Sequence, residues 1–256
     1  MNIIIVMPTY NEAENISRMI ETLCGNVFND IKNKHPQSSM HLLVVDDNSP
    51  DGTGDVVRLK EKDYGSLHLL SGERNGLGNA YIRGFKYAVN TLKADAVIEM
   101  DADFQHNPDY IKSFVNAFSN GADYVIGSRY IDGGSIPSGW EWYRSIVSNY
   151  GNLFAKFMLR LDGINDLTTG FRLTRVKGVL ENIDLDNLMA LNRFAYKVDL
   201  MHKTAGLSKK TVEVPIHFLE REKEKSKFSF MEMVVTYKVV MTLWLYDRFD
   251  ALVKSL

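Results

Sequence analysis

The chain has 256 residues and an ordinary apolar content of 45%, so it is long enough to bury the core of one large α/β domain or of one domain with an appendage. A formal net charge of −2 argues against a general nucleic-acid-binding protein, and a single cysteine excludes an internal disulfide framework and a cysteine-based metal site. The sequence contains no uninterrupted run of about 18 apolar residues, and it begins without a basic region or cleavage site, so we expect neither a membrane-spanning helix nor a signal peptide.

Short apolar runs alternate with helical repeats through the first half of the chain. Buried strands are expected at residues 3–7, 42–45, 68–70, 96–100 and 124–127. Helices are expected where apolar residues recur every three or four positions, at residues 16–23, 77–88 and 110–118. This order predicts an α/β fold in which a mainly parallel central sheet is covered by helices on both faces.

The second half has a different pattern. A helical stripe covers residues 147–161, and residues 211–218 favour a strand that contains Pro215 and therefore lies near a sheet edge or a bulge. We divide the chain into a domain over residues 1–229 and a C-terminal amphipathic segment over residues 230–256. That tail is apolar on most sides, so it is either an ordinary core helix or a helix that lies in a membrane interface.

Two carboxylates directly follow the strand expected at residues 96–100. Asp101 and Asp103 repel each other unless a positive charge is close, and a divalent cation bound to substrate phosphates is the usual solution. Gln105 offers a neutral oxygen from the same loop. A solvated polar loop is the alternative interpretation of such a short motif.

Polar residues at two other strand ends strengthen the first interpretation. Residues 8–12 and residues 46–47 follow the first two strands, and neighbouring parallel strands lie only about 4.8 Å apart. These three strand ends therefore reach one ligand of the size of a nucleoside diphosphate. The first strand is followed by no glycine-rich phosphate loop, which disfavours a dinucleotide-binding oxidoreductase and a P-loop NTPase. We interpret residues 75–79 as a glycine-rich turn near the ligand.

Five motifs identify a resemblance. They are MPTYNE at 7–12, VDDNSPDGT at 45–53, DAD at 101–103, GSRY at 127–130 and TGFR at 169–172. Together they resemble glycosyltransferase family 2, and within it the dolichol-phosphate (polyprenol-phosphate) mannosyltransferases, from residue 3 to about residue 230. The resemblance implies a GT-A fold, a GDP-mannose donor, Mg²⁺ or Mn²⁺, and a polyprenyl phosphate acceptor. It also implies a peripheral protein on the cytoplasmic side of a membrane, acting alone or with small membrane subunits.

The resemblance also assigns roles to residues. Those expected to bind the donor are Pro8, Tyr10, Glu12, Asp47, Asp101, Ala102, Asp103, Gln105, Arg129, Lys197, Arg221 and Lys227, with Ser226 in the same closing loop as the last two. The expected metal ligands are Asp101, Asp103 and Gln105, and the expected acceptor-phosphate residues are Arg129, Arg144 and Ser148. Asp101, Asp103 and Arg129 are the expected catalytic residues. We expect Arg172 to pair internally and His106 to be a hydrogen-bonded structural residue.

The chemistry that these residues suit is an inverting transfer. A metal and arginines would stabilise the departing diphosphate, and a phosphate acceptor needs no general base because its second pKa is about 6. Two departures from the family pattern leave the sugar open, namely Glu224 where relatives have glycine and the segment at 193–199 in place of Gly-Tyr-Ala-Phe-Gln-Ile-Glu.

Three alternatives remain. They are a family 2 transferase with a UDP-hexose donor or a polysaccharide acceptor, a non-catalytic scaffold subunit, and a nucleotidyltransferase. The intact Asp101/Asp103 pair disfavours a scaffold. A nucleotidyltransferase would need a glycine-rich basic loop after the first strand, which residues 8–12 do not supply.

Overall fold

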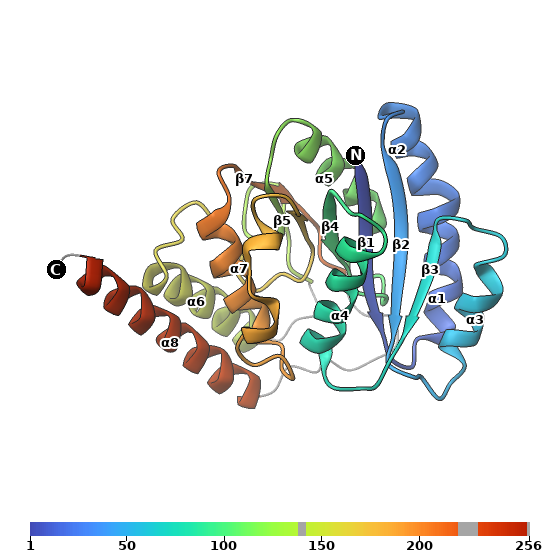
Figure 1. Ribbon diagram of the computed structural model, residues 1–256. Helices are drawn as coiled ribbons and strands as arrows, with labels where there is room; N and C mark the ends of the chain where they lie inside the picture. The colour runs from blue at the N-terminus through green and yellow to red at the C-terminus, as the bar shows by residue number, and fades with distance from the viewer. Residues whose placement is uncertain (138–141, 220–229, 255–256) are drawn as a thin grey trace.

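The computed structural model describes residues 1–137, 142–219 and 230–254, and of the side chains within these ranges it leaves out 142–147, 230 and 250–254. This part of the chain contains a seven-stranded sheet with helices on both faces (Figure 1). The expected α/β fold is therefore confirmed.

The strands run in the order β3-β2-β1-β4-β6-β5-β7. Their bounds are β1 Asn2–Thr9, β2 Ser39–Asp46, β3 Leu67–Ser71, β4 Ala96–Glu99, β5 Tyr124–Ser128, β6 Arg172–Arg175 and β7 Thr211–Pro215. All described pairs are parallel except the two that β6 makes with β4 and β5. The prediction of a mainly parallel sheet is confirmed, and β7 lies at the sheet edge, as Pro215 indicated. The short antiparallel strand β6 was not predicted, because four residues that begin and end with arginine form no apolar run.

Helices form at each expected position, although their ends differ by several residues, and three further helices at Phe28–Lys34, Thr53–Lys60 and Tyr196–Leu207 were not predicted. Their bounds are α1 Ala13–Ile20, a π-helical segment Glu21–Val27, α2 Phe28–Lys34, α3 Thr53–Lys60, α4 Leu77–Asn90, α5 Ile111–Ser119, α6 Trp142–Met158, α7 Tyr196–Leu207 and α8 Phe230–Lys254. Short 3₁₀ turns cover Pro108–Tyr110, Leu180–Asn182 and Leu185–Asn187.

The two faces of the sheet are covered by different helices. Alternate residues of β1, including Ile3 and Ile5, pack with α1, α2 and α5, whereas Ile4 and Val6 pack with α4 and α7. Helix α4 approaches the sheet closely, because a Cβ on Gly84 would lie 2.9 Å from a methyl group of Val45 and would overlap Val6. A third apolar cluster joins β5 to α6, α7 and α8.

The C-terminal segment forms one long helix beside α6 (Figure 1). Val239, Val240 and Leu243 of α8 are buried against the third cluster, while Tyr246 and Phe249 are exposed. Helix α8 therefore contributes to the core along one stripe and leaves large apolar side chains on another. No helix in the described residues has the length and apolar character needed to cross a membrane.

Candidate active site

Three loops meet at the C-terminal edge of the parallel strands, directly after β1, β2 and β4. Each contains one non-glycine residue in the left-handed conformation, namely Asn11 (φ 60°), Asn48 (φ 52°) and Phe104 (φ 60°). Asparagine tolerates this conformation, whereas for a bulky residue such as Phe104 it is strained. Such backbone strain is typical of functional sites, where the surrounding structure maintains it.

A cavity of about 900 Å³ opens at this edge, a volume within the usual range for small-molecule sites. Ten of the residues predicted from the sequence line it, and these are Pro8, Tyr10, Glu12, Asp47, Asp101, Ala102, Asp103, Gln105, Arg129 and Ser148. Gly76 and Leu77 of the glycine-rich turn also line it. The structure thus brings together residues from the three predicted strand ends and from two later segments.

Five predicted residues do not appear among these lining residues. Lys197 lies behind the cavity wall with a fully buried side chain. Arg144 lies in α6, but its side chain is outside the described part of the chain. Arg221 and Lys227, together with Ser226, also lie outside the described residues.

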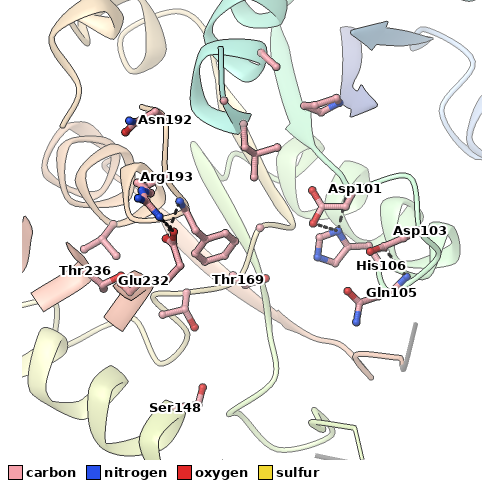
Figure 2. Close-up of a pocket in the computed structure, with 18 of the residues that line it drawn as sticks. Asp101, Asp103, Gln105, His106, Ser148, Thr169, Asn192, Arg193, Glu232 and Thr236 are labelled. Atoms are coloured by element: carbon pink, nitrogen blue, oxygen red, sulfur yellow. Dashed lines mark hydrogen bonds and ion pairs between the residues drawn. The ribbon is translucent and has the colours of Figure 1, made fainter. Parts of the chain in front are cut away.

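Neutral hydrogen-bond donors orient the acidic pair, which Figure 2 shows at one side of the cavity. The Tyr81 hydroxyl donates to Asp101 Oδ1 at 3.0 Å, and the Gln105 backbone N–H donates to Asp103 Oδ1 at 3.1 Å. The Asp101 side chain is 29% exposed, so its carboxylate borders the cavity and is not sealed in the core. Tyr81 was not identified from the sequence, because on the helical stripe of α4 it resembles an ordinary core residue.

This arrangement fits a Mg²⁺ or Mn²⁺ ion that is shared with a ligand. Asp101, Asp103 and Gln105 offer hard oxygen donors at one side of the cavity. Among the described residues there is no cluster of three or more His, Cys, Asp or Glu side chains that could hold a metal alone. A cation here would therefore complete its shell with phosphate and water oxygens, which is the usual coordination of Mg²⁺ at phosphate sites.

His106 supports the acidic loop from behind. Its Nδ1 accepts a hydrogen bond from the Asp101 backbone amide at 3.2 Å, and its ring stacks on Phe171 at a centroid distance of 4.9 Å. Burial lowers the pKa of His106 to about 4, although the nearby Asp101 carboxylate acts in the opposite direction. The ring is therefore neutral near pH 7, with its proton on Nε2. The expectation of a hydrogen-bonded structural histidine is confirmed.

We call Asp47, Asp101 and Asp103 the acidic rim of the cavity. Two arginines that the sequence analysis did not identify lie beside Asp47 and Tyr10. Arg83 donates to Asp47 Oδ1 at 2.7 Å, and the Arg74 guanidinium lies 3.7 Å from the centre of the Tyr10 ring. Arg74 follows β3 in the turn that precedes Gly76, so its position after a strand end was the available signal.

Arg129 forms a buried ion pair with Asp166. Its Nε and Nη2 donate to the two carboxylate oxygens at 2.7 Å each, and Nη2 also donates to Thr168 at 2.8 Å. Burial alone would raise the pKa of Asp166, but the Arg129 charge outweighs it and the pKa is lowered. Both groups are therefore ionised, and Arg129 is a fixed positive charge in the cavity wall.

Arg172 is buried next to this pair. Its guanidinium donates to the carbonyl oxygens of Lys197 at 2.8 Å and of Leu167 at 3.0 Å. The prediction that Arg172 pairs internally is confirmed.

The cavity continues away from the acidic rim toward α6 and α8, where its wall becomes apolar. The apolar lining there comes from α6, α7 and α8 and consists of Phe154, Ala155, Val198, Met233, Tyr237 and Val240. Phe154 and Tyr237 stack across the seam between α6 and α8 with their ring centres 5.5 Å apart.

Figure 2 shows Arg193 and Glu232 across the cavity from the acidic residues. Arg193 donates to Glu232 at 3.1 Å, and this ion pair links the loop before α7 to the start of α8.

The chain matches a known family and several known proteins. The family is described as "Glycosyl transferase family 2", and the match covers residues 4–181. The polyprenol monophosphomannose synthase of Mycolicibacterium smegmatis is 37% identical over 228 residues, which are 88% of this chain and 80% of that protein. The undecaprenyl-phosphate mannosyltransferase of Micrococcus luteus is 38% identical over 230 residues, or 90% of this chain and 88% of that protein.

A solved structure resembles the fold. It is glucosyl-3-phosphoglycerate synthase from Mycobacterium tuberculosis in complex with Mn²⁺, uridine diphosphate and glucosyl-3-phosphoglycerate, with a TM-score of 0.56 and 16% identity over 94% of this chain and 78% of that one. At this identity the likeness concerns the fold alone.

Proposed function

The chain belongs to glycosyl transferase family 2 and has the GT-A fold, and from this premise we propose that it transfers mannose from GDP-mannose to a polyprenyl phosphate. The family resemblance that the motifs indicated is confirmed by the matched family and by both relatives. The choice of a lipid phosphate acceptor follows the relatives, whose names specify polyprenol and undecaprenyl phosphate. GDP-mannose as the donor is our own inference from the motifs.

One observation carries the proposal: a single cavity joins an acidic rim to an apolar seam. Asp47, Asp101 and Asp103 lie at the first end, where the nucleoside diphosphate would bind. The apolar residues of α6 and α8 lie at the other end and suit the first isoprene units of the acceptor. Arg129 and Ser148 line the same cavity, so they are available to the acceptor phosphate.

The fixed charges suit the transfer of a sugar between two phosphates. Arg129 is aligned in advance by Asp166, so its charge stabilises the departing diphosphate without reorganisation. When bound to Asp101, Asp103 and Gln105, Mg²⁺ or Mn²⁺ supplies Lewis-acid stabilisation of the diphosphate. The chain needs no general base for the acceptor, because a phosphate monoester with a second pKa of about 6 is already mostly dianionic at neutral pH. Direct attack by this oxygen on the anomeric carbon inverts its configuration.

The remaining predicted residues complete the proposal. Arg144 would hold the acceptor phosphate with Ser148, and Arg221 and Lys227 would close over the donor. Alanine substitution of Arg144 should raise the KM for the lipid acceptor more than the KM for GDP-mannose. Alanine substitution of Arg221 should instead raise the KM for GDP-mannose more than the KM for the lipid acceptor.

We also propose peripheral association with the cytoplasmic side of a membrane. The seam between α6 and α8 is flanked by exposed apolar side chains, with Tyr150, Leu153 and Phe157 on α6 and Leu245, Tyr246 and Phe249 on α8. Large exposed apolar patches of this kind are typical of protein or membrane contact sites. A lipid surface is the partner that this surface suits best, because the apolar seam of the cavity opens between the same two helices.

Flotation with anionic phospholipid vesicles tests the membrane proposal. Phe157→Glu should reduce the bound fraction, because this side chain is 78% exposed. Leu59→Glu is the matched control, since Leu59 is 64% exposed and belongs to α3, a helix far from α6 and α8 at the other end of the sheet (Figure 1). Equal flotation of both variants and the unchanged protein would contradict this surface. Flotation that requires an added small membrane protein would instead support a partner subunit.

A transfer assay tests the activity itself. Radiolabelled GDP-mannose, a short polyprenyl phosphate and Mn²⁺ should give a product that partitions into organic solvent, and a chelator should abolish it. Unlabelled GDP-mannose should compete more strongly than UDP-glucose. Nucleotide binding without any lipid product would contradict the proposal and favour a polysaccharide acceptor.

A further inference from the structure

Lys197 is a buried cation that the proposed chemistry does not use directly. It is the second residue of α7, and its side chain is fully buried. The ammonium Nζ has no hydrogen-bond partner among the described residues, and it lies 4.0 Å from Asp101 Oδ1. An ammonium without hydrogen bonds is costly to bury, so its place in the structure requires compensation.

The residues around Lys197 leave a closely lined space for its charged Nζ. The rings of Tyr81 and Phe194 lie 5.2 Å and 4.9 Å from Nζ, distances at which a ring face attracts a cation. A Cβ on Gly170 would overlap Nζ, so Nζ has room at this position only because residue 170 is glycine. The Arg172 guanidinium holds the Lys197 carbonyl oxygen at 2.8 Å and thereby fixes the backbone below the side chain.

The nearest described anion is Asp101, which faces the cavity on its other side. Tyr81 contacts both groups, because its hydroxyl donates to Asp101 while its ring faces Lys197. The carboxylate thus has a fixed positive charge behind it and the proposed cation position in front of it. Charge interactions at such depth are weakly screened by salt.

We propose that Lys197 is a resident counter-charge for Asp101 that limits how tightly the site binds a divalent cation. This inference rests on the proposed function, since it takes Asp101 as a metal ligand. In the absence of a cation, the ammonium stabilises the ionised carboxylate and keeps it oriented. When a cation is bound, the same ammonium repels it, so the site holds the cation firmly only when diphosphate oxygens contribute. Lys197 acts through Asp101 and is a positioning residue.

The test measures binding of Mn²⁺ alone to the full chain, by the electron paramagnetic resonance signal of free Mn²⁺. Lys197→Gln and Lys197→Met both remove the charge, one with a polar side chain and one with an apolar side chain. We expect each to bind Mn²⁺ more tightly by on the order of tenfold. Lys203→Gln is the matched control, because Lys203 lies on the same helix and pairs with Asp199 at 2.9 Å, away from the acidic rim.

The outcomes separate this inference from the proposed function. Equal or weaker Mn²⁺ binding by both Lys197 variants, with native circular dichroism spectra, would overturn the role of Lys197. Asp101→Asn should abolish Mn²⁺ binding in every background. Retained binding in that variant would instead overturn the metal site itself, whatever the Lys197 variants show.

Discussion

The acidic rim and the Arg129–Asp166 pair differ in how exposed their charged groups are and in what stabilises them. Asp101 is partly exposed and is oriented by the neutral Tyr81 hydroxyl, whereas Asp166 is fully buried and neutralised by an arginine in direct contact. The carboxylates of the rim can therefore receive a cation from outside, while Asp166 holds the Arg129 charge in a fixed position in the cavity wall. The comparison shows that one cavity combines a surface that is available for ligand charge with a wall whose charge is fixed.

Asp101→Asn should have the largest effect on activity, and its effect on stability should be smaller than that of losing Asp166, because Asp101 is 29% exposed and lies 4.0 Å from Lys197 without a hydrogen bond to it. The substitution keeps the shape of the side chain but removes the charge that would hold the cation. We expect transfer to fall by about three orders of magnitude, in line with the loss of several kcal/mol of transition-state stabilisation. The radiolabel transfer assay measures this effect. Substantial remaining transfer would show that the rim does not provide the catalytic charge.

Asp166→Asn should have its largest effect on stability, which we expect it to lower strongly. The variant leaves the buried Arg129 charge without its partner, which typically costs about 3–5 kcal/mol of unfolding free energy. Urea denaturation measures the loss. Asp47→Asn is the control at the rim, because Asp47 also pairs with an arginine but the Arg83 side chain is 27% exposed. We expect the control to lose less than Asp166→Asn, because this pair is less completely buried, with 9% of the Asp47 side chain and 27% of the Arg83 side chain exposed. Similar losses for both variants would remove the distinction between the two regions.

Two glycines allow a similar comparison of packing density, because Gly84 lies in a tightly packed contact and Gly151 has open space beside it. Gly84→Ala should lower the unfolding free energy by about 1–3 kcal/mol, because the new methyl group meets Val6 and Val45 in the tightly packed contact between α4 and the sheet. Gly151→Ala in α6 should instead raise it by about 0.5–1 kcal/mol, since nothing lies within 4 Å of the new atom and alanine favours a helix. Thermal or urea unfolding would show opposite signs. A loss at both positions would indicate that α6 is packed as tightly as α4.

The smallest expected effect is a pH dependence at the sheet edge, where the His41 and His68 rings share a hydrogen bond of 3.0 Å. Burial lowers the pKa of both histidines, and the pair disfavours a second positive charge on His41. A lowered folded-state pKa gives stability that is full above the unfolded value of about 6.5 and that declines as the pH falls. The melting temperature should therefore decrease below about pH 6.5, and less steeply in His68→Gln. Parallel curves for the two proteins would contradict this assignment.

Sequence reasoning located the parts of the site that follow strand ends. Residues 8–12, Asp47 and the Asp101–Asp103 pair lie where the alternation of strands and helices placed them, because carboxyl ends of parallel strands share one edge. Three of the five motifs that carried the family resemblance lie at these strand ends, and the matched family confirms that resemblance. The roles of Arg144, Arg221 and Lys227 stay predictions.

Only the tertiary structure decided the partners of these residues. Asp166 lies 37 positions from Arg129 in the sequence. The buried Arg172 begins β6, an antiparallel strand that was not predicted because it contains no apolar run. The family resemblance implied that Lys197 contacts the donor, which stays a prediction, and only the fold showed that its buried ammonium lies 4.0 Å from Asp101 and outside the residues that line the cavity. Periodicity and turn residues report local backbone preferences, which is why the sequence alone determined the sheet edge and its acids. The pairing of charges depends on which distant segments pack together and on how much water they exclude, and that information exists only in the folded chain.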